Sequence, residues 1–395
     1  MRIFDERDTM FSRLGLMKKT KKYREYYQTH PDLQKEDDRV RESTRKTMAK
    51  IFSIEPDHME KRSKRMAVIL KIINIFLDIT GKKMSMNPDR MLRMGAAVKE
   101  DDIIHSAMAE PAARMANLIN KEADRQKISK HKVEIDAKEM SAVIKTMALC
   151  YGGDVVGIAK LKSHHHYSHR GDIFGMGGGY GKRIHLSYQY AVVIASALNK
   201  DMVNRAPGKD VQIASMLGYA RSSVVTAQMV LYIKSLGYDA LTDNFIEYYS
   251  PLSPLAADAG IGQMGRCNMV VNREYGNRLK IGAVLTNLPL IEDGPVDYGL
   301  VEFCLACGKC ARNCPVKAIS DGEPEMMNGV LQWRHNETKC MEMWMKNGTG
   351  ICMASCPFSQ GVDPELLKNM KGNKDIIKKI ISTDSKMLPQ ILPAL

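Results

Sequence analysis

Apolar residues recur every three to four positions along the N-terminal part of the chain, a spacing that predicts amphipathic helices. The pattern is clearest at 65–79, RMAVILKIINIFLDI, and at 96–120. The longest apolar run, 66–79, is interrupted by Lys71 and is too short for a bilayer span, so it predicts a buried or interfacial helix. We expect residues 1–137 to form a mostly helical region with no transmembrane segment.

The pattern changes near Glu139. Residues 139–162 combine an amphipathic helix, a Gly-Gly turn and a β-branched strand, which predicts the start of a mixed α/β core. Further strands are predicted at 190–198 and 278–290, with a helix at 224–238 between them in the chain. Gly237 is suited to end that helix because glycine readily adopts the left-handed conformation. We assign 138–300 to this core.

Cysteines concentrate in the next region, 301–360. Seven of the nine cysteines fall between Cys304 and Cys356, at the close spacings of metal ligands, which favours metal and a reducing compartment over disulfides. The remaining residues, 361–395, return to a Lys-rich helical pattern and predict a tail that packs on the core.

The first cysteine motif predicts an iron-sulfur cluster. Cys304, Cys307, Cys310 and Cys314 have the spacing Cys-x2-Cys-x2-Cys-x3-Cys-Pro of bacterial two-cluster ferredoxins. In that arrangement the first three thiolates bind one cluster and the fourth binds the other. Zinc is the weaker alternative, because zinc sites rarely use this run of four.

The second motif lacks one cysteine. By the crossing rule Cys356 returns to complete the first 4Fe-4S cluster, which leaves Cys314, Cys340 and Cys352 for the second. Thr349 stands where a Cys-x2-Cys step would need a thiolate. The sequence allows a 3Fe-4S cluster, a 4Fe-4S cluster with a non-cysteine ligand, or recruitment of a distant thiol such as Cys267. We favour the first, because three thiolates match three irons.

Charge and the N-terminus bear on partners and compartment. The net charge of +13 and the sequence pI of about 9.2 favour an anionic partner: an acidic electron donor, a membrane surface or nucleic acid. The start of the chain, MRIFDERDTMF, has no apolar leader and no twin arginines. This predicts a cytoplasmic protein as written, or a periplasmic or membrane-associated one if an export leader was removed.

The segment 251–290 resembles the corrinoid-dependent reductive dehalogenases. It contains PLSPLAADAGIGQMGR, then YGNRLK, then TNLPL ahead of the cysteines. The N-terminal DERDTMFSR and YREYYQTHP are also similar to the mature start of respiratory members of that family. The epoxyqueuosine reductases, which modify tRNA, share the same kind of core and cluster segment.

The resemblance implies an α+β fold: a nitroreductase-like core that holds base-off cobalamin, an N-terminal helical layer and an inserted two-cluster ferredoxin-like segment. It also implies reduction of an aryl or alkenyl halide to the dehalogenated product and halide. The motif Asp-x-His-x-x-Gly, which supplies a histidine to cobalt in other corrinoid proteins, is absent. Gly260, Gly262 and Gly265 would let the backbone approach the cofactor, although a tight turn explains them equally well.

The resemblance also implies a catalytic pair, Tyr219 and Lys280. A phenol has an ordinary pKa near 10, and a nearby cation lowers it by stabilising the phenolate. Tyr219 would then protonate carbon as halide leaves. Arg278 is the alternative cation if the register differs by two residues, and we also count it among the cofactor-binding residues. Trp344 is expected to lie between a cluster and the corrin, or equally to pack in the core.

Two other segments attract attention without changing the interpretation. SHHHYSHRG, 163–171, suggests a metal site, but we expect a surface loop near the mouth of the cofactor site. GMGGGYGKR, 175–183, lacks the Walker A spacing and predicts a loop. Cys150 is expected to be a buried small residue.

We expect a small organohalide as substrate and a low-potential donor, whether ferredoxin, flavodoxin or a membrane-bound protein. We do not expect a nucleic-acid partner, and homo-oligomerisation is left open. The alternatives are an epoxyqueuosine reductase and a corrinoid reductase or electron-transfer protein without dehalogenase activity.

Overall fold

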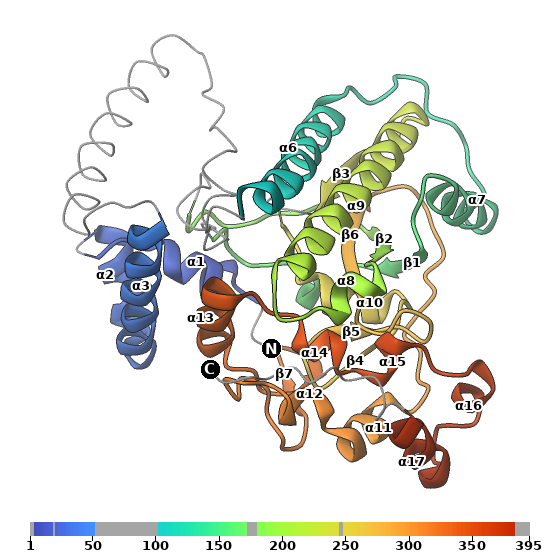
Figure 1. Cartoon of the computed structure of the whole chain (residues 1–395). Helices are drawn as coiled ribbons and strands as arrows, with labels where there is room; N and C mark the ends of the chain where they lie inside the picture. The colour runs from blue at the N-terminus through green and yellow to red at the C-terminus, as the bar shows by residue number, and fades with distance from the viewer. Residues whose placement is uncertain (1–3, 19, 52–101, 172–179, 245–247, 384–395) are drawn as a thin grey trace.

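The computed structural model describes residues 4–18, 20–51, 102–171, 180–244 and 248–383 (Figure 1). The predicted helix at 65–79 lies outside the described residues, as does most of the predicted loop at 175–183. The described part combines helices with sheet, as the sequence predicts. No helix within the described ranges is long and apolar enough to cross a membrane.

A four-stranded antiparallel sheet forms the centre, in the order β1-β2-β6-β3. Its strands are β1 (Val155–Lys160), β2 (Tyr190–Ala197), β6 (Leu279–Thr286) and β3 (Ala240–Asp243). The two central strands, β2 and β6, are buried almost throughout, which explains why both read as continuous apolar runs. The strands predicted at 190–198 and 278–290 are confirmed, and they pair with each other.

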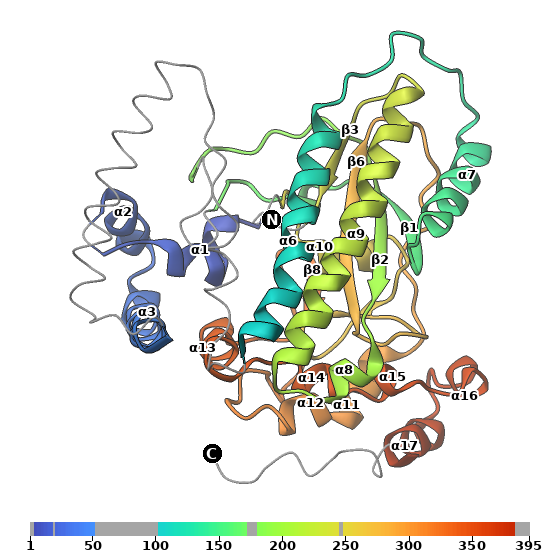
Figure 2. The same ribbon diagram turned by 45° about the horizontal axis from the view of Figure 1, so that its top comes forward.

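Three helices cover one face of this sheet (Figure 2): α6 (Asp102–Arg125), α7 (Ala137–Cys150) and α9 (Lys209–Ser235). Helix α6 runs along α9 and so joins the N-terminal region to the core. Gly237 follows the end of α9 with φ of +85°, as predicted. Helix α9 starts fifteen residues before the predicted start at 224. The prediction missed its first half because that half lacks a clear apolar stripe.

The first half of α9 contains Gly218, which brings the helix close to the sheet. A Cβ atom there would lie 2.5 Å from Leu198 Cδ2 and 2.9 Å from Lys280 Cγ. A larger side chain would displace the side chains of Leu198 and Lys280. Glycine therefore favours the close approach of Lys280 to this part of α9, next to Tyr219.

The opposite face is covered by α10 (Leu252–Asp258) and a short ribbon of β4 (Gln263–Met264) and β5 (Val270–Val271). Gly157 in β1 permits this packing, since a Cβ atom there would lie 2.0 Å from the Ala259 carbonyl oxygen. The sheet is thus enclosed between two layers, which excludes water from its central strands.

The N-terminal helices stand beside the core and against α13 (Glu337–Asn347) (Figure 1). They are α1 (Met10–Gly15), α2 (Lys21–Thr29) and α3 (Pro31–Ile51). A buried ion pair ties them together: Arg13 Nε lies 2.9 Å from Asp37 Oδ2, and Tyr27 donates to the same carboxylate. The described residues of this region are mostly helical, and its extent as a unit, 1–137, stays a prediction.

The cysteine segment lies at one end of the sheet (Figure 1, bottom). It contains α11 (Leu300–Cys307), α12 (Lys309–Arg312), the hairpin β7 (Glu325–Met327) and β8 (Val330–Gln332), α14 (Ile351–Ala354) and α15 (Pro357–Gln360). The chain continues into α16 (Pro364–Lys368) and α17 (Lys374–Thr383). The tail is helical as predicted, and α17 packs on α11 through Ile377 and Ile380.

Candidate iron-sulfur and catalytic site

One cavity gathers cysteines from both motifs. Helix α11 carries Cys304 and Cys307, and Gly308 then adopts a left-handed φ of 55°, which lets the chain reverse into α12 with Cys310. The cavity is lined by Cys304, Cys307, Cys310, Cys352 and Cys356, together with Cys267. Three cysteines of the first motif thus share a cavity with two of the second, Cys352 and Cys356.

The two cysteine motifs contact each other. Helix α12 packs against α14, and Asn313 Nδ2 donates to Ser355 Oγ at 3.0 Å. Cys356 lies within electrostatic range of Cys304 and Cys307, whereas Cys340 lies within range of Cys314. Cys352 lies within range of Cys314 and Cys340, but also of Cys310, and it lines the same cavity as the first motif. The assignment of Cys304, Cys307, Cys310 and Cys356 to one cluster, and of Cys314, Cys340 and Cys352 to the other, stays a prediction.

Burial determines the protonation of these cysteines. It raises the pKa of Cys304, Cys310, Cys352 and Cys356, and raises that of Cys340 to about 11. Closely packed thiols of this kind remain neutral unless a metal binds them, and a metal deprotonates its thiol ligands outright. Sulfur ligands are those that iron-sulfur clusters use, so the donor set fits two clusters.

The predicted tyrosine and lysine lie together. Lys280 Nζ lies 4.6 Å from the centre of the Tyr219 ring, so Lys280 rather than Arg278 is the cation at this position. Tyr248 adds a contact that the sequence did not reveal, because its hydroxyl donates to the Tyr219 hydroxyl at 3.2 Å. No local pattern around Tyr248 distinguishes it from its neighbour Tyr249. The catalytic roles stay predictions.

The pKa of Tyr219 is lowered from its ordinary value. Burial alone would raise it, but the charge of Lys280 and the hydrogen bonds from Tyr248 and Lys280 outweigh that effect. The pKa of Tyr248 is raised, first by burial and then by the neighbouring Tyr219. Tyr219 is the more acidic phenol of the pair, and the residue as a whole is half-buried.

A buried hydroxyl lies next to this pair. Ser196 is the cross-strand neighbour of Lys280, it is fully buried, and its Oγ has no hydrogen-bond partner within the described residues. Buried hydroxyls without a partner are rare in native proteins. The surroundings of Lys280 thus retain hydrogen-bonding capacity that a bound molecule with polar groups can use.

The three predicted cofactor-binding glycines contact the chain itself. A Cβ atom at Gly262 would lie 2.0 Å from the Val271 carbonyl oxygen, and Gly260 has a left-handed φ of +74°. Gly265 lines the cysteine cavity. Packing within the chain accounts for Gly262 and a turn for Gly260, while cobalamin binding by these glycines stays a prediction.

Arg278 and Trp344 also make contacts within the protein. Arg278 is buried and donates to two backbone oxygens, Ser359 O at 2.7 Å and Leu198 O at 2.5 Å. Trp344 packs with Met10 and Val40, and its ring meets Phe11 edge to face at 6.0 Å. The packing alternative for Trp344 is therefore the one that its described contacts favour.

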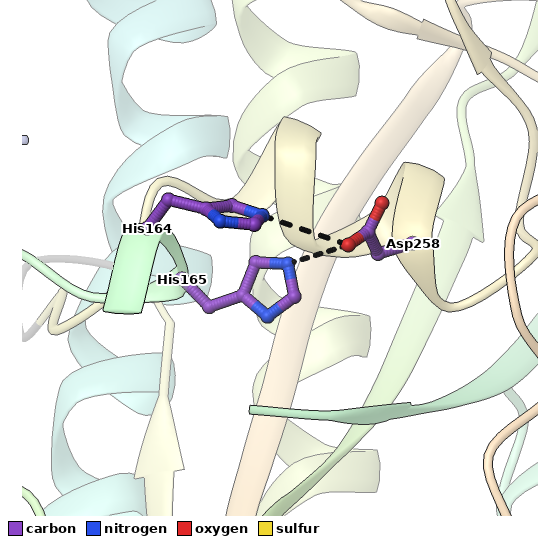
Figure 3. Close-up of side chains that lie close together, drawn as sticks. All are labelled: His164, His165 and Asp258. Atoms are coloured by element: carbon purple, nitrogen blue, oxygen red, sulfur yellow. Dashed lines mark hydrogen bonds and ion pairs between the residues drawn. The ribbon is translucent and has the colours of Figure 1, made fainter. Parts of the chain in front are cut away.

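Histidines of the SHHHYSHRG segment meet Asp258 (Figure 3). Asp258 Oδ2 lies 3.0 Å from His165 Nε2 and 3.6 Å from His164 Nε2, and Lys162 Nζ lies 2.9 Å from the same oxygen. The backbone N–H of Lys162 donates to His165 Nδ1, so Nε2 carries the proton and donates to the carboxylate. His165 is fully buried, so the expectation of a surface loop is wrong there. The protonated Nε2 also disfavours a metal ion.

Cys150 was expected to be buried, and this is wrong: it is exposed at the end of α7.

Comparison with known proteins agrees with this geometry. Residues 303–360 match the 4Fe-4S dicluster domain family. The tetrachloroethene reductive dehalogenase of Sulfurospirillum multivorans is 28% identical over 260 residues, which is 57% of this chain and 51% of that protein. The chain is a relative of the reductive dehalogenases.

A solved reductive dehalogenase supports the same relationship. That structure, described as suggesting a mechanism for B12-dependent dehalogenation, superimposes with a TM-score of 0.61 at 26% identity, covering 71% of this chain and 41% of its own. The epoxyqueuosine reductase of Lactococcus garvieae is 30% identical over 145 residues, 34% of this chain and 38% of that protein. The chain spans about half the length, or less, of the reductive dehalogenases to which it is similar.

Proposed function

We propose that the protein is an iron-sulfur and cobalamin-dependent reductive dehalogenase. The observation that carries the proposal is the contact of Tyr219 with Lys280 and Tyr248, in a chain whose match to the dicluster domain contains seven cysteines. The reaction adds two electrons and one proton to an organohalide, breaks the carbon–halogen bond, forms a carbon–hydrogen bond and releases halide. An aryl or alkenyl halide is the proposed substrate class.

Cobalamin would lie beside Tyr219 and Lys280. His164 and His165 contact Asp258, so we do not propose them as residues that hold it. The unpartnered Ser196 hydroxyl next to Lys280 also fits a ligand rich in polar groups. When bound, cobalamin supplies a strongly reducing cobalt centre that removes the halogen. We propose a nitroreductase-like core, residues 138–300, as the frame that holds it. The other proposed units are the helical region 1–137, the iron-sulfur segment 301–360 and the tail 361–395.

Residues of the chain itself hold the proton and transfer it to carbon. Tyr219 holds it on its hydroxyl and gives it to carbon, and the resulting phenolate is stabilised by the Lys280 ammonium and by the Tyr248 hydroxyl. The lowered pKa of Tyr219 makes it a better acid than an ordinary phenol. A group that donates a proton in the rate-limiting step contributes about 10²- to 10⁴-fold to the rate.

The electrons come from a low-potential donor through the cysteine segment. The basic charge of the whole chain, +13, suits an acidic donor such as a ferredoxin or flavodoxin, and equally a donor at a membrane surface. We propose such a donor as the partner and do not propose nucleic acid.

Anaerobic reconstitution tests the proposal. The chain is loaded with iron, sulfide and cobalamin, reduced with a low-potential reductant, and offered chlorinated and brominated phenols and alkenes. We expect halide release with one halide per two electrons, and loss of that release when Tyr219 is changed to Phe. If cobalamin binds and is reduced but no compound releases halide, the proposal is wrong and an electron-transfer role is favoured.

The epoxyqueuosine reductase relationship provides a second candidate, because the match to the Lactococcus garvieae protein is 30% identical. The same reconstituted protein is therefore also offered tRNA that carries epoxyqueuosine. Formation of queuosine without halide release would replace the first proposal with this one.

A further inference from the structure

Cys267 lies in the cluster cavity although it is far from the cysteine segment in sequence. It occupies the loop between β4 and β5, it is 7% exposed, and it lines the cavity together with five cysteines of the cluster motifs. It also packs in one group with Cys310, Cys314 and Cys352. Cys314 and Cys352 are assigned to the cluster that lacks a ligand. Cys304, Cys310 and Cys356 also lie near Cys267, but they already belong to a predicted set of four.

Burial raises the pKa of the Cys267 thiol, but several N–H donors face its sulfur. Asn277 Nδ2 donates to Sγ at 3.1 Å, and the backbone N–H groups of Met269 and Cys267 also donate toward it. A neutral thiol is only a weak acceptor, whereas thiolates bound to iron commonly accept hydrogen bonds. The donors therefore suit a sulfur that carries negative charge.

The orientation of the Asn277 amide is fixed by its neighbour. The backbone N–H of Asn277 donates to Ser359 Oγ at 3.3 Å, and Ser359 Oγ in turn donates to Asn277 Oδ1 at 2.6 Å. The oxygen of the amide is thus occupied, and its N–H group must face Cys267. Both Asn277 and Ser359 are buried, so water does not compete for these bonds.

Thr349 is poorly suited to the missing position. It lies between Gly348 and Gly350, which both have positive φ and pack against Gly208 and Val211 at the start of α9. Its hydroxyl is a hard oxygen ligand, whereas iron-sulfur clusters select thiolates. A nearby thiolate is the stronger candidate.

We propose that Cys267 supplies the fourth thiolate of the second cluster, beside Cys314, Cys340 and Cys352, so that both clusters are 4Fe-4S. This differs from the three-iron cluster that the sequence alone favours. The proposal depends on the proposed function in one respect: both require that the chain assembles two clusters.

Iron content and electron paramagnetic resonance of the anaerobically reconstituted full chain test this assignment. Oxidised 3Fe-4S clusters give a signal, whereas 4Fe-4S clusters in their usual oxidised state do not. We expect about eight irons and no such signal from the unchanged protein, and about seven irons with the signal from Cys267→Ala. Adding Thr349→Cys to Cys267→Ala should restore about eight irons and remove the signal.

Cys150→Ala is the matched control. Cys150 is exposed on α7, so its substitution should leave the iron content and the resonance signal unchanged. A three-iron signal of full intensity from the unchanged protein would overturn the assignment even if Cys267→Ala failed to fold. A Cys267→Ala protein that keeps about eight irons and gives no 3Fe-4S signal would also overturn the assignment. A chain that takes up no iron contradicts the proposed function as well, whereas full iron without halide release contradicts that function alone.

Discussion

The hydroxyl of Tyr248 donates a hydrogen bond to the hydroxyl of Tyr219 across 3.2 Å. This bond stabilises the phenolate that remains after Tyr219 gives up its proton. We expect Tyr248→Phe to raise the pKa of Tyr219 and to lower kcat about 10-fold, the effect of losing one hydrogen bond to a charged group. The measurement is the pH profile of halide release. Tyr232→Phe is the control, because it removes a hydroxyl from a tyrosine of α9 that packs against the core. An equal loss of kcat in both variants would argue for a structural effect.

Tyr219→Phe removes the proposed acid itself. We expect about a 10²- to 10⁴-fold loss of turnover while cobalamin and iron contents stay unchanged, because the ring packs as before and only the hydroxyl is lost. Cofactor content is measured by absorbance and metal analysis on the same sample. Retention of activity at full cofactor loading would remove Tyr219 from the mechanism.

Lys280→Gln removes the cation that lies 4.6 Å from the Tyr219 ring. Tyr219 donates only while protonated, so the rate falls as pH rises through its pKa. The lowered pKa of the native protein places this alkaline decline below the ordinary tyrosine range. In the variant the charge contribution is lost, so the decline should move to higher pH and the rate at neutral pH should drop about 100-fold. An unchanged profile would show that Lys280 acts by other means.

Asp243 should make stability depend on pH. Burial raises the pKa of this fully buried carboxyl from 3.8 to about 7. The folded state therefore holds its proton more tightly than the unfolded state, and this contribution is fully present below pH about 3.8 and lost as pH rises through about 7. The shift corresponds to an effect on the order of 4 kcal/mol. Denaturant unfolding at a series of pH values should show it, and Asp243→Asn should flatten the curve.

Gly262→Ala tests whether this glycine is required by the chain itself. Its Cβ would lie 2.0 Å from the Val271 carbonyl oxygen, so the backbone of β5 must move, at a cost of about 3 kcal/mol in the free energy of unfolding. Gly322→Ala is the control, because its Cβ would lie 3.4 Å from Ser320 Oγ and the position is exposed. Equal midpoints of denaturation for the two variants would contradict the packing account.

Much of the fold can be predicted from the sequence because strong local patterns carry it. Strands β2 and β6 are buried on both faces and read as apolar runs, and α9 ends where Gly237 permits a left-handed turn. The predicted cysteine grouping follows from motif spacing. Tyr248 and the burial of His165 cannot be predicted in this way, because both depend on contacts between segments that are distant along the chain.

The position of Arg278, immediately before β6, has a mechanical consequence. Its guanidinium joins Leu198 O to Ser359 O, three residues after the predicted cluster ligand Cys356, and Lys280 lies two residues after Arg278 in β6. Electron tunnelling slows steeply with distance, and proton transfer needs a fixed separation of donor and acceptor. Because Arg278 links the segment of Cys356 to the start of the strand that carries Lys280, we expect a displacement at one predicted site to be felt at the other.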